Sequence, residues 1–254
     1  MICTFVNCMK PFCSEKRYAI VTKKPFGVNA VMTRRWNTLF LLIAAVDLIV
    51  IVLEILGFVI NFPYERFRMV RFYTQDSNFF TLVACMIQLI YVLPRLRGEP
   101  DRPMPRWITV LKFISAGTLF ITFLIVITVL APADCVQKYH SLFGYYNMCV
   151  YGSRLYHHTI CPVLTVVSFF LLDDPDNLRR RDSFFILWYT LIYGVVLLAL
   201  NYFYIVRGPY GFLHVHEQKW YITVLWGIIL MSIAYGTGRL MLWGNRKLSL
   251  SKRL

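Results

Sequence analysis

A threonine and two adjacent histidines open two apolar segments of the chain, and side chains of these types could do nucleophilic chemistry together. Thr74 lies in the run Phe-Tyr-Thr-Gln-Asp-Ser-Asn at residues 72–78, and His157 and His158 begin the run His-His-Thr-Ile-Cys-Pro at residues 157–162. A threonine hydroxyl is a poor nucleophile unless a base takes its proton, and a histidine imidazole is suited to that role near neutral pH. We therefore expect the Thr74 hydroxyl within hydrogen-bonding reach of one of the two histidines.

Polar neighbours in the same motifs could support such a site. The carboxylate of Asp76 could orient an imidazole, and Asn78, Arg154 and the free N–H groups at helix starts could stabilise a developing oxyanion. Each motif also has a structural interpretation. Thr74 or Asp76 could cap a helix, and histidines at a helix end are often simply solvated.

The elements that must position these residues are membrane-spanning helices. Of the 254 residues, 58% are apolar and 16% are charged, and the mean hydropathy is +0.56. A soluble chain of this length carries roughly 25% charged residues and cannot bury so large an apolar surplus. The composition predicts an integral membrane protein.

The chain contains six apolar windows, each long enough to cross a bilayer core of about 30 Å as a helix. We expect one all-α, six-helix transmembrane domain over residues 39–243, flanked by basic segments at residues 1–38 and 244–254. The windows are Leu39 to Ile60, Ser77 to Leu93, Ile108 to Leu130, Tyr156 to Leu172, Phe184 to Val206 and Tyr221 to Trp243.

The distribution of basic residues predicts the orientation of the spans. Lys and Arg number 27 against 13 Asp and Glu, and 18 of the 27 lie in the two flanking segments and the second and fourth loops. Six lie in the other loops. The excess predicts that both termini are cytoplasmic, and it explains the net charge of +14 without a nucleic-acid partner. Thr74 and all five histidines then lie at the outer face.

Polar residues also line the interior of the predicted helix bundle. Thr74, Ser77, Asn78, Thr81, Cys85 and Gln88 form one stripe, and Cys161, Thr165 and Ser168 form another. Asp47 and Glu54 share one face of the first span. They either pair structurally, with Arg239 as a partner for Glu54 and Asp47 protonated, or serve a proton or ion path.

Three motifs together resemble a known family. Phe-Tyr-Thr-Gln-Asp-Ser-Asn, His-His-Thr-Ile-Cys-Pro and Gly-Pro-Tyr-Gly-Phe-Leu-His at residues 208–214 are similar to motifs of the androgen-induced membrane hydrolases and their uncharacterised bacterial six-span relatives. The resemblance implies a hydrolase of lipid esters in a membrane, for which a bacterial plasma membrane is favoured. The resemblance also implies that such a hydrolase uses a threonine nucleophile, a histidine base and no metal or other cofactor.

Carried onto this chain, the nucleophile falls on Thr74 and the base on His157 or His158, with His214 as a supporting residue of the third motif. The chain departs from the family pattern at Gly211, where a proline is usual. The expected partners are membrane lipids or lipid-like esters.

Two other functions are compatible with the sequence. Outer histidines such as His157, His158, His214 and His216 could bind zinc in a metal-dependent lipid enzyme, although no recognised zinc signature is present. A transport-type or non-enzymatic membrane protein would instead use Asp47 and Glu54.

Overall fold

The computed structural model describes residues 26–96 and 104–251, in which every regular element is a helix. Six helical segments are long and apolar enough to cross a membrane, and this confirms the expected all-α polytopic architecture. They are Asn37–Arg71, Tyr73–Leu96, Arg106–Tyr139, Leu155–Leu172, Arg180–Tyr202 and Trp220–Leu248.

The helices are longer than the apolar windows. Helix α1 begins at Phe26, inside the expected flanking segment 1–38, and α8 continues to Leu248, inside the expected tail. The other helices are α2 (Tyr73–Leu96), α3 (Arg106–Ile125), α4 (Ala131–Asp134), α5 (Phe143–Cys149), α6 (Cys161–Leu172) and α7 (Ser183–Tyr202). A helix can continue beyond the apolar window because its backbone hydrogen bonds are internal and do not depend on the surrounding solvent.

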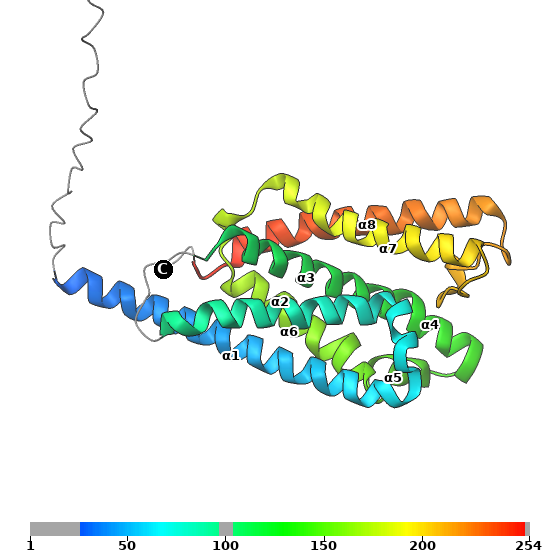
Figure 1. The fold of residues 1–254 in the computed structure, drawn as a ribbon, viewed down its shortest axis with the longest axis horizontal. Helices are drawn as coiled ribbons and strands as arrows, with labels where there is room; N and C mark the ends of the chain where they lie inside the picture. The colour runs from blue at the N-terminus through cyan, green and yellow to red at the C-terminus, as the bar shows by residue number, and fades with distance from the viewer. Residues whose placement is uncertain (1–25, 97–103, 252–254) are drawn as a thin grey trace, which may run out of the picture.

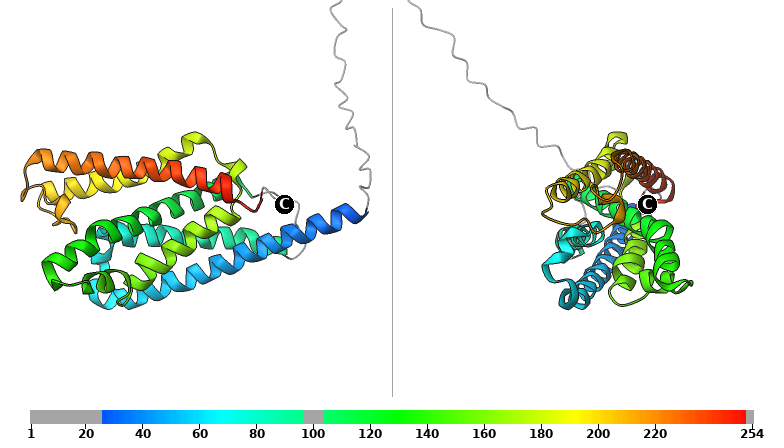
Figure 2. Two further views of the ribbon diagram at one scale, coloured as in Figure 1. Left: turned by 180° about the vertical axis from the view of Figure 1, so that it is seen from behind. Right: turned by 90° about the vertical axis from the view of Figure 1, so that its right-hand side faces the viewer.

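The spans form two packed groups. Helices α1, α2, α3 and α6 pack against one another, while α7 and α8 form an antiparallel pair whose main contacts outside the pair are with α3 and α6 (Figures 1 and 2). The described chain starts and ends at the same end of the bundle, here called the terminal end (Figure 1). The opposite end, where α2 begins, is called the Thr74 end.

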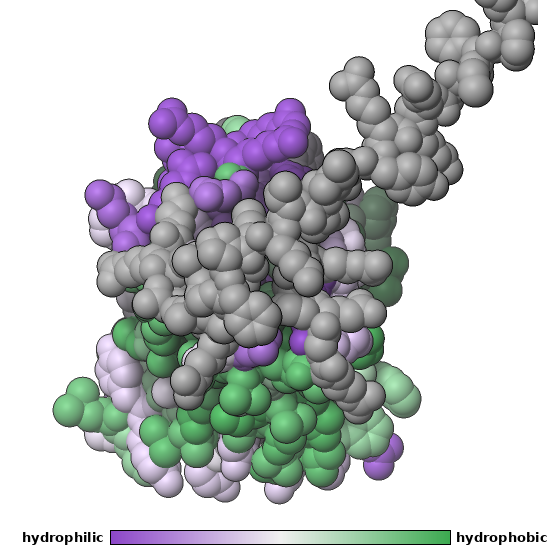
Figure 3. All heavy atoms as spheres, turned by 90° about the vertical axis from the view of Figure 1, so that its left-hand side faces the viewer, coloured by the Kyte–Doolittle hydropathy of each residue, from purple (hydrophilic) through white to green (hydrophobic). Residues whose placement is uncertain are grey.

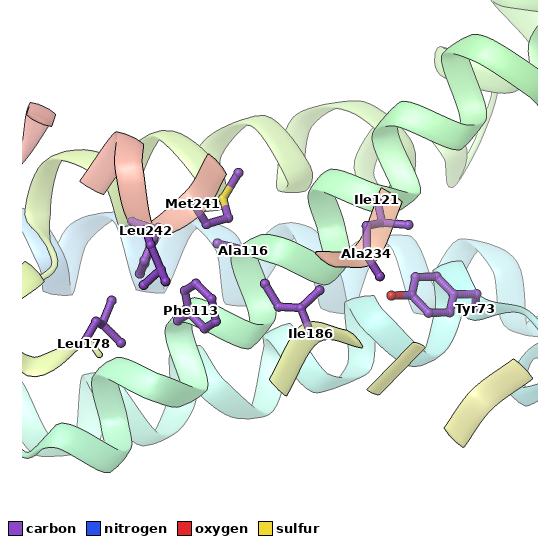
Figure 4. Packing of buried hydrophobic residues seen from close by; sticks show 10 residues of the cluster. Tyr73, Phe113, Ala116, Ile121, Leu178, Ile186, Ala234, Met241 and Leu242 are labelled. Carbon is purple, nitrogen blue, oxygen red and sulfur yellow. The ribbon is translucent and has the colours of Figure 1, made fainter. Parts of the chain in front are cut away.

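Helices α3, α7 and α8 are packed tightly at the terminal end. Figure 4 shows Phe113 and Ala116 of α3 beside Met241 and Leu242 of α8, with Tyr73 far along the same row of side chains. A Cβ atom added at Gly238 of α8 would lie 2.6 Å from the Ser183 carbonyl oxygen. Helices α7 and α8 therefore lie close to each other at this end.

The same pair leaves open space nearer the Thr74 end. Gly194 of α7 and Gly227 of α8 have no atom within 4 Å of an added Cβ. Large exposed apolar side chains such as Ile192 and Ile228 cover the outer surface of α7 and α8, as lipid contact requires.

Figure 3 views the terminal end, where hydrophilic side chains gather on one part and apolar side chains cover much of the remaining visible surface.

Candidate functional site

Thr74 lies in the first turn of α2 and is 6% exposed. Phe72 is extended, so the helix begins at Tyr73 with free backbone N–H groups. The hydroxyl of Tyr210, from the loop after α7, interacts with the N–H groups of Tyr73 and Thr74 and with the Thr74 side chain. Burial raises the pKa of the Tyr210 phenol, which therefore keeps its proton and remains a hydrogen-bond donor.

Thr74 and Tyr210 both line a cavity of about 660 Å³ between α3, α7 and α8. This volume is within the usual range for small-molecule sites, roughly 300–1,000 Å³. Most of the wall is aliphatic or aromatic, and Val224 and Ile228 line it while also being about half exposed. The cavity is therefore bordered by apolar side chains that lipid would contact.

The two histidines lie in a π-helical turn, Leu155–Ile160, that leads into α6. Pro162 follows in the first turn of α6 and has no N–H to donate to the carbonyl of residue 158, so the helix ladder is interrupted at this point. Wider turns of this kind occur often at functional sites. Both imidazoles are buried.

The side chain of His157 is directed at α1. Its Nε2 lies 3.4 Å from the Glu54 carboxylate oxygen Oε2 and 3.3 Å from the Glu54 carbonyl oxygen, so Nε2 carries a proton. The ring packs on Phe58, with 4.6 Å between ring centroids, and fits against Gly57, where an added Cβ would lie 2.2 Å from Nε2. Contacts on this side fix the ring firmly in place.

His158 has the opposite tautomer. Its Nδ1 lies 2.7 Å from the carbonyl oxygen of Met148. Because a carbonyl oxygen can only accept, Nδ1 carries the proton and Nε2 of the neutral ring keeps a lone pair. A backbone carbonyl thus orients this imidazole, which is the role that Asp76 was expected to fill.

Asn78 connects the two motifs. Its Nδ2 donates to the Thr74 carbonyl oxygen at 2.6 Å and to the His157 carbonyl oxygen at 3.1 Å. The structure therefore brings Thr74 and the histidine turn to the same end of the bundle. Within residues 26–96 and 104–251, however, no hydrogen bond joins the Thr74 hydroxyl to either imidazole.

The remaining predicted site residues have other partners. Asp76 lies within electrostatic range of Tyr189, Tyr193 and Tyr210. Arg154 donates to the Asn147 carbonyl oxygen at 3.0 Å, and His214 is held by Glu217 and the Gly208 carbonyl oxygen. The Asn78 amide donates to two carbonyl groups, so it is not free to bind an oxyanion.

The proposed pairing of Glu54 with Arg239 is wrong. Glu54 contacts His157 and the Cys161 thiol, whereas Arg239 is exposed on α8. Asp47 is not without a partner either, because Lys112 of α3 lies 2.8 Å from Asp47 Oδ1. The buried polar stripes on α2 and α6 are confirmed.

Sequence reasoning missed two neighbours of the site, Glu54 and Tyr210. The signal for Glu54 was a carboxylate in an apolar span, but the sequence does not show which helix faces it. The signal for Tyr210 was its place in the third motif.

Across the described ranges, no three or more His, Cys, Asp or Glu residues gather closely enough to hold a metal ion.

Fold and composition together define an integral, multi-pass membrane protein with six spanning helices. No family model, curated protein or solved structure matches the chain.

Proposed function

We propose that this protein hydrolyses lipid esters within the membrane, with Thr74 as the nucleophile and His158 as the base. The observation that carries the proposal is the position of the Thr74 hydroxyl. It lies on the wall of a 660 Å³ apolar cavity, beside the Tyr210 hydroxyl and in the helical turn that Asn78 ties to the histidines.

His158 suits the role of base better than His157. Nε2 of His158 has a lone pair, whereas the lone pair of His157 is on Nδ1, and the ring of His157 is held against Phe58 and Gly57 of α1. Hydrogen bonds at catalytic sites are often long without substrate and tighten when it binds, so the absence of a direct contact with Thr74 is compatible with this assignment.

The cavity favours a substrate with a long apolar chain. Its wall is mostly apolar, and Thr74 and Tyr210 are among its polar groups, so an acyl chain could fill it with the ester group beside Thr74. Such a substrate can enter from the bilayer without crossing water. We place the protein in a bacterial plasma membrane with both termini cytoplasmic, as the family resemblance and the 18 to 6 distribution of basic residues favour.

The reaction would proceed in two steps. The Thr74 oxygen attacks the ester carbonyl carbon while its proton passes to His158, and the alcohol leaves with that proton, which gives an acyl-threonine. Water then adds to the acyl carbon, and the carboxylic acid and free Thr74 are released. The Tyr210 hydroxyl, which interacts with Thr74, would donate to the oxyanion in both steps.

A fluorophosphonate probe, which labels activated hydroxyl nucleophiles, tests this proposal. We expect the purified protein to be labelled, Thr74→Ala to abolish labelling, and His158→Gln to reduce it more than His157→Gln. Thr223→Ala is the matched control, because Thr223 is a threonine that lines the same cavity from α8 instead of α2. Labelling that persists in Thr74→Ala would refute the assignment.

A further inference from the structure

A second polar region lies between α1, α2, α3 and α6, apart from the cavity. We call it the polar file. It extends from His157 and Asn78 at the Thr74 end to Asp173 at the terminal end, and all its residues are buried. Its members are Asp47, Glu54, Asn78, Thr81, Cys85, Gln88, Lys112, Ser115, His157, Thr165 and Asp173.

Hydrogen bonds join parts of the file. Ser115 donates to Thr81 at 2.8 Å, which in turn donates to the Ser77 carbonyl oxygen. Lys112 donates to Asp47 and to the Cys85 sulfur, and Gln88 donates to Asp173 at 3.1 Å. The file therefore contains short bonded pieces with breaks between them.

At the breaks lie buried atoms that make no hydrogen bond within the protein. They share one property, which is that each can accept a proton or a hydrogen bond. They are Asp47 Oδ2, both carboxylate oxygens of Glu54, Asn78 Oδ1, Gln88 Oε1, His157 Nδ1 and Thr165 Oγ1. Buried acceptors of this kind are normally satisfied by internal water, which brings two protons to each site.

The charges of the file also favour the binding of protons. Asp47, Glu54 and Asp173 are three acidic groups, and Lys112 is the basic group among them. With all four ionised the formal charge is −2, which is expensive at bilayer depth. The groups that face Glu54 are His157 and Cys161 of the α6 segment, and neither contributes a fixed positive charge. Binding of two protons to the acidic groups would neutralise the file.

The arrangement suits a proton better than a metal ion. Asp47 and Glu54 are seven residues apart on α1, about 10 Å along the axis, so the acceptors are spread along the bundle. A metal ion needs several ligands that converge on one point, and none of the described residues gather in that way. A proton needs one acceptor at a time and can move between acceptors through water.

We propose that the polar file is a proton-transfer path through the bundle, with Glu54 as the exchange site beside His157 and Asp173 as the exchange site at the terminal end. Each carboxylate or water takes up a proton on one side and releases one on the other, so no covalent bond to carbon is made or broken. Lys112 stays paired with Asp47 and does not carry the moving proton.

The test is proton flux into vesicles of phosphatidylcholine and phosphatidylglycerol that contain the full-length protein and a trapped pH-sensitive dye. A potassium gradient with valinomycin supplies the driving voltage. We expect vesicles with the wild-type protein to acidify faster than protein-free vesicles and Glu54→Gln to lose this flux. Glu217→Gln, the same change at an exposed carboxylate, should retain it.

Further variants separate the proton path from folding and from hydrolysis. Glu54→Asp keeps a carboxyl group and should restore part of the flux, and Thr74→Ala should conduct as the wild type does. Monodisperse elution from a sizing column shows that each variant is folded. Wild-type flux no greater than that of empty vesicles, unchanged flux in Glu54→Gln, or flux that requires Na⁺ would overturn the proposal.

Discussion

The buried ion pair between Asp47 and Lys112 makes a quantitative prediction about stability. Lys112 Nζ lies 2.8 Å from Asp47 Oδ1, and the side chains of Lys112 and Asp47 are 1% and 2% exposed. Lys112→Met keeps most of the aliphatic stem and removes the charge. Asp47 then loses its partner, and its Oδ2 already has none within the protein.

Breaking a buried pair on one side costs about 3–5 kcal/mol. At roughly 2–4 °C per kcal/mol for a chain of this size, the thermal midpoint should fall by roughly 6–20 °C. The double variant Asp47→Asn with Lys112→Met removes both charges and should recover most of this loss, because no uncompensated charge remains.

The assay is thermal unfolding in detergent, followed by tryptophan fluorescence, for the wild type, both single variants and the double variant. Arg207→Met breaks the exposed Arg207–Glu217 pair and should leave the midpoint unchanged. A Lys112→Met midpoint equal to that of the wild type, or a double variant that is as unstable as the single one, would refute the reasoning.

Three further predictions follow from other positions. Gly57→Ala forces a methyl group into the ring of His157 and should destabilise the fold by about 1–3 kcal/mol, whereas Gly236→Ala, with open space around it, should not lower the thermal midpoint. The leucine side chain of Gly227→Leu should project into the cavity and reduce hydrolysis of long-chain esters more than of short-chain esters in a turnover assay. The thermal stability of this variant should not fall. An equal loss of hydrolysis on both chain lengths would contradict the assignment of the cavity. Burial raises the pKa of Asp173 to about 7, so the folded state holds a proton there that the unfolded chain releases near pH 4, and stability should fall as pH rises between roughly 4 and 7, by at most about 1.4 kcal/mol per unit. Asp173→Asn should remove this slope from denaturation curves measured across that range.

Much of the architecture could be predicted because lipid allows few solutions. A run of apolar residues as long as that after Leu39 has to form a helix, because a helix satisfies its own backbone hydrogen bonds in lipid. The side chains of Ser77, Thr81 and Gln88 share one face of their helix, and this polar face has to contact protein rather than lipid. These inferences need only the local sequence and the apolar character of the lipid around it, and the structure confirms them.

Pairings between helices could not be predicted in the same way. Lys112 stands in an apolar window, where the sequence does not indicate its partner, and the packing of α3 against α1 brings it to Asp47. Likewise Glu54 was assigned to Arg239, and the packing of α6 against α1 brings His157 to it instead. Sequence periodicity shows which face of a helix is buried, but it does not show the rotation and depth of the helix that lies opposite.

Asn78 connects the cavity and the polar file, and this determines which variants can distinguish their functions. Its amide nitrogen holds the backbones of Thr74 and His157, while its Oδ1 is one of the acceptors of the file. A change at Asn78 would therefore disturb hydrolysis and proton transfer together. Thr74 lines the cavity and Glu54 faces His157 and Cys161, so changes at these two side chains should affect one activity each.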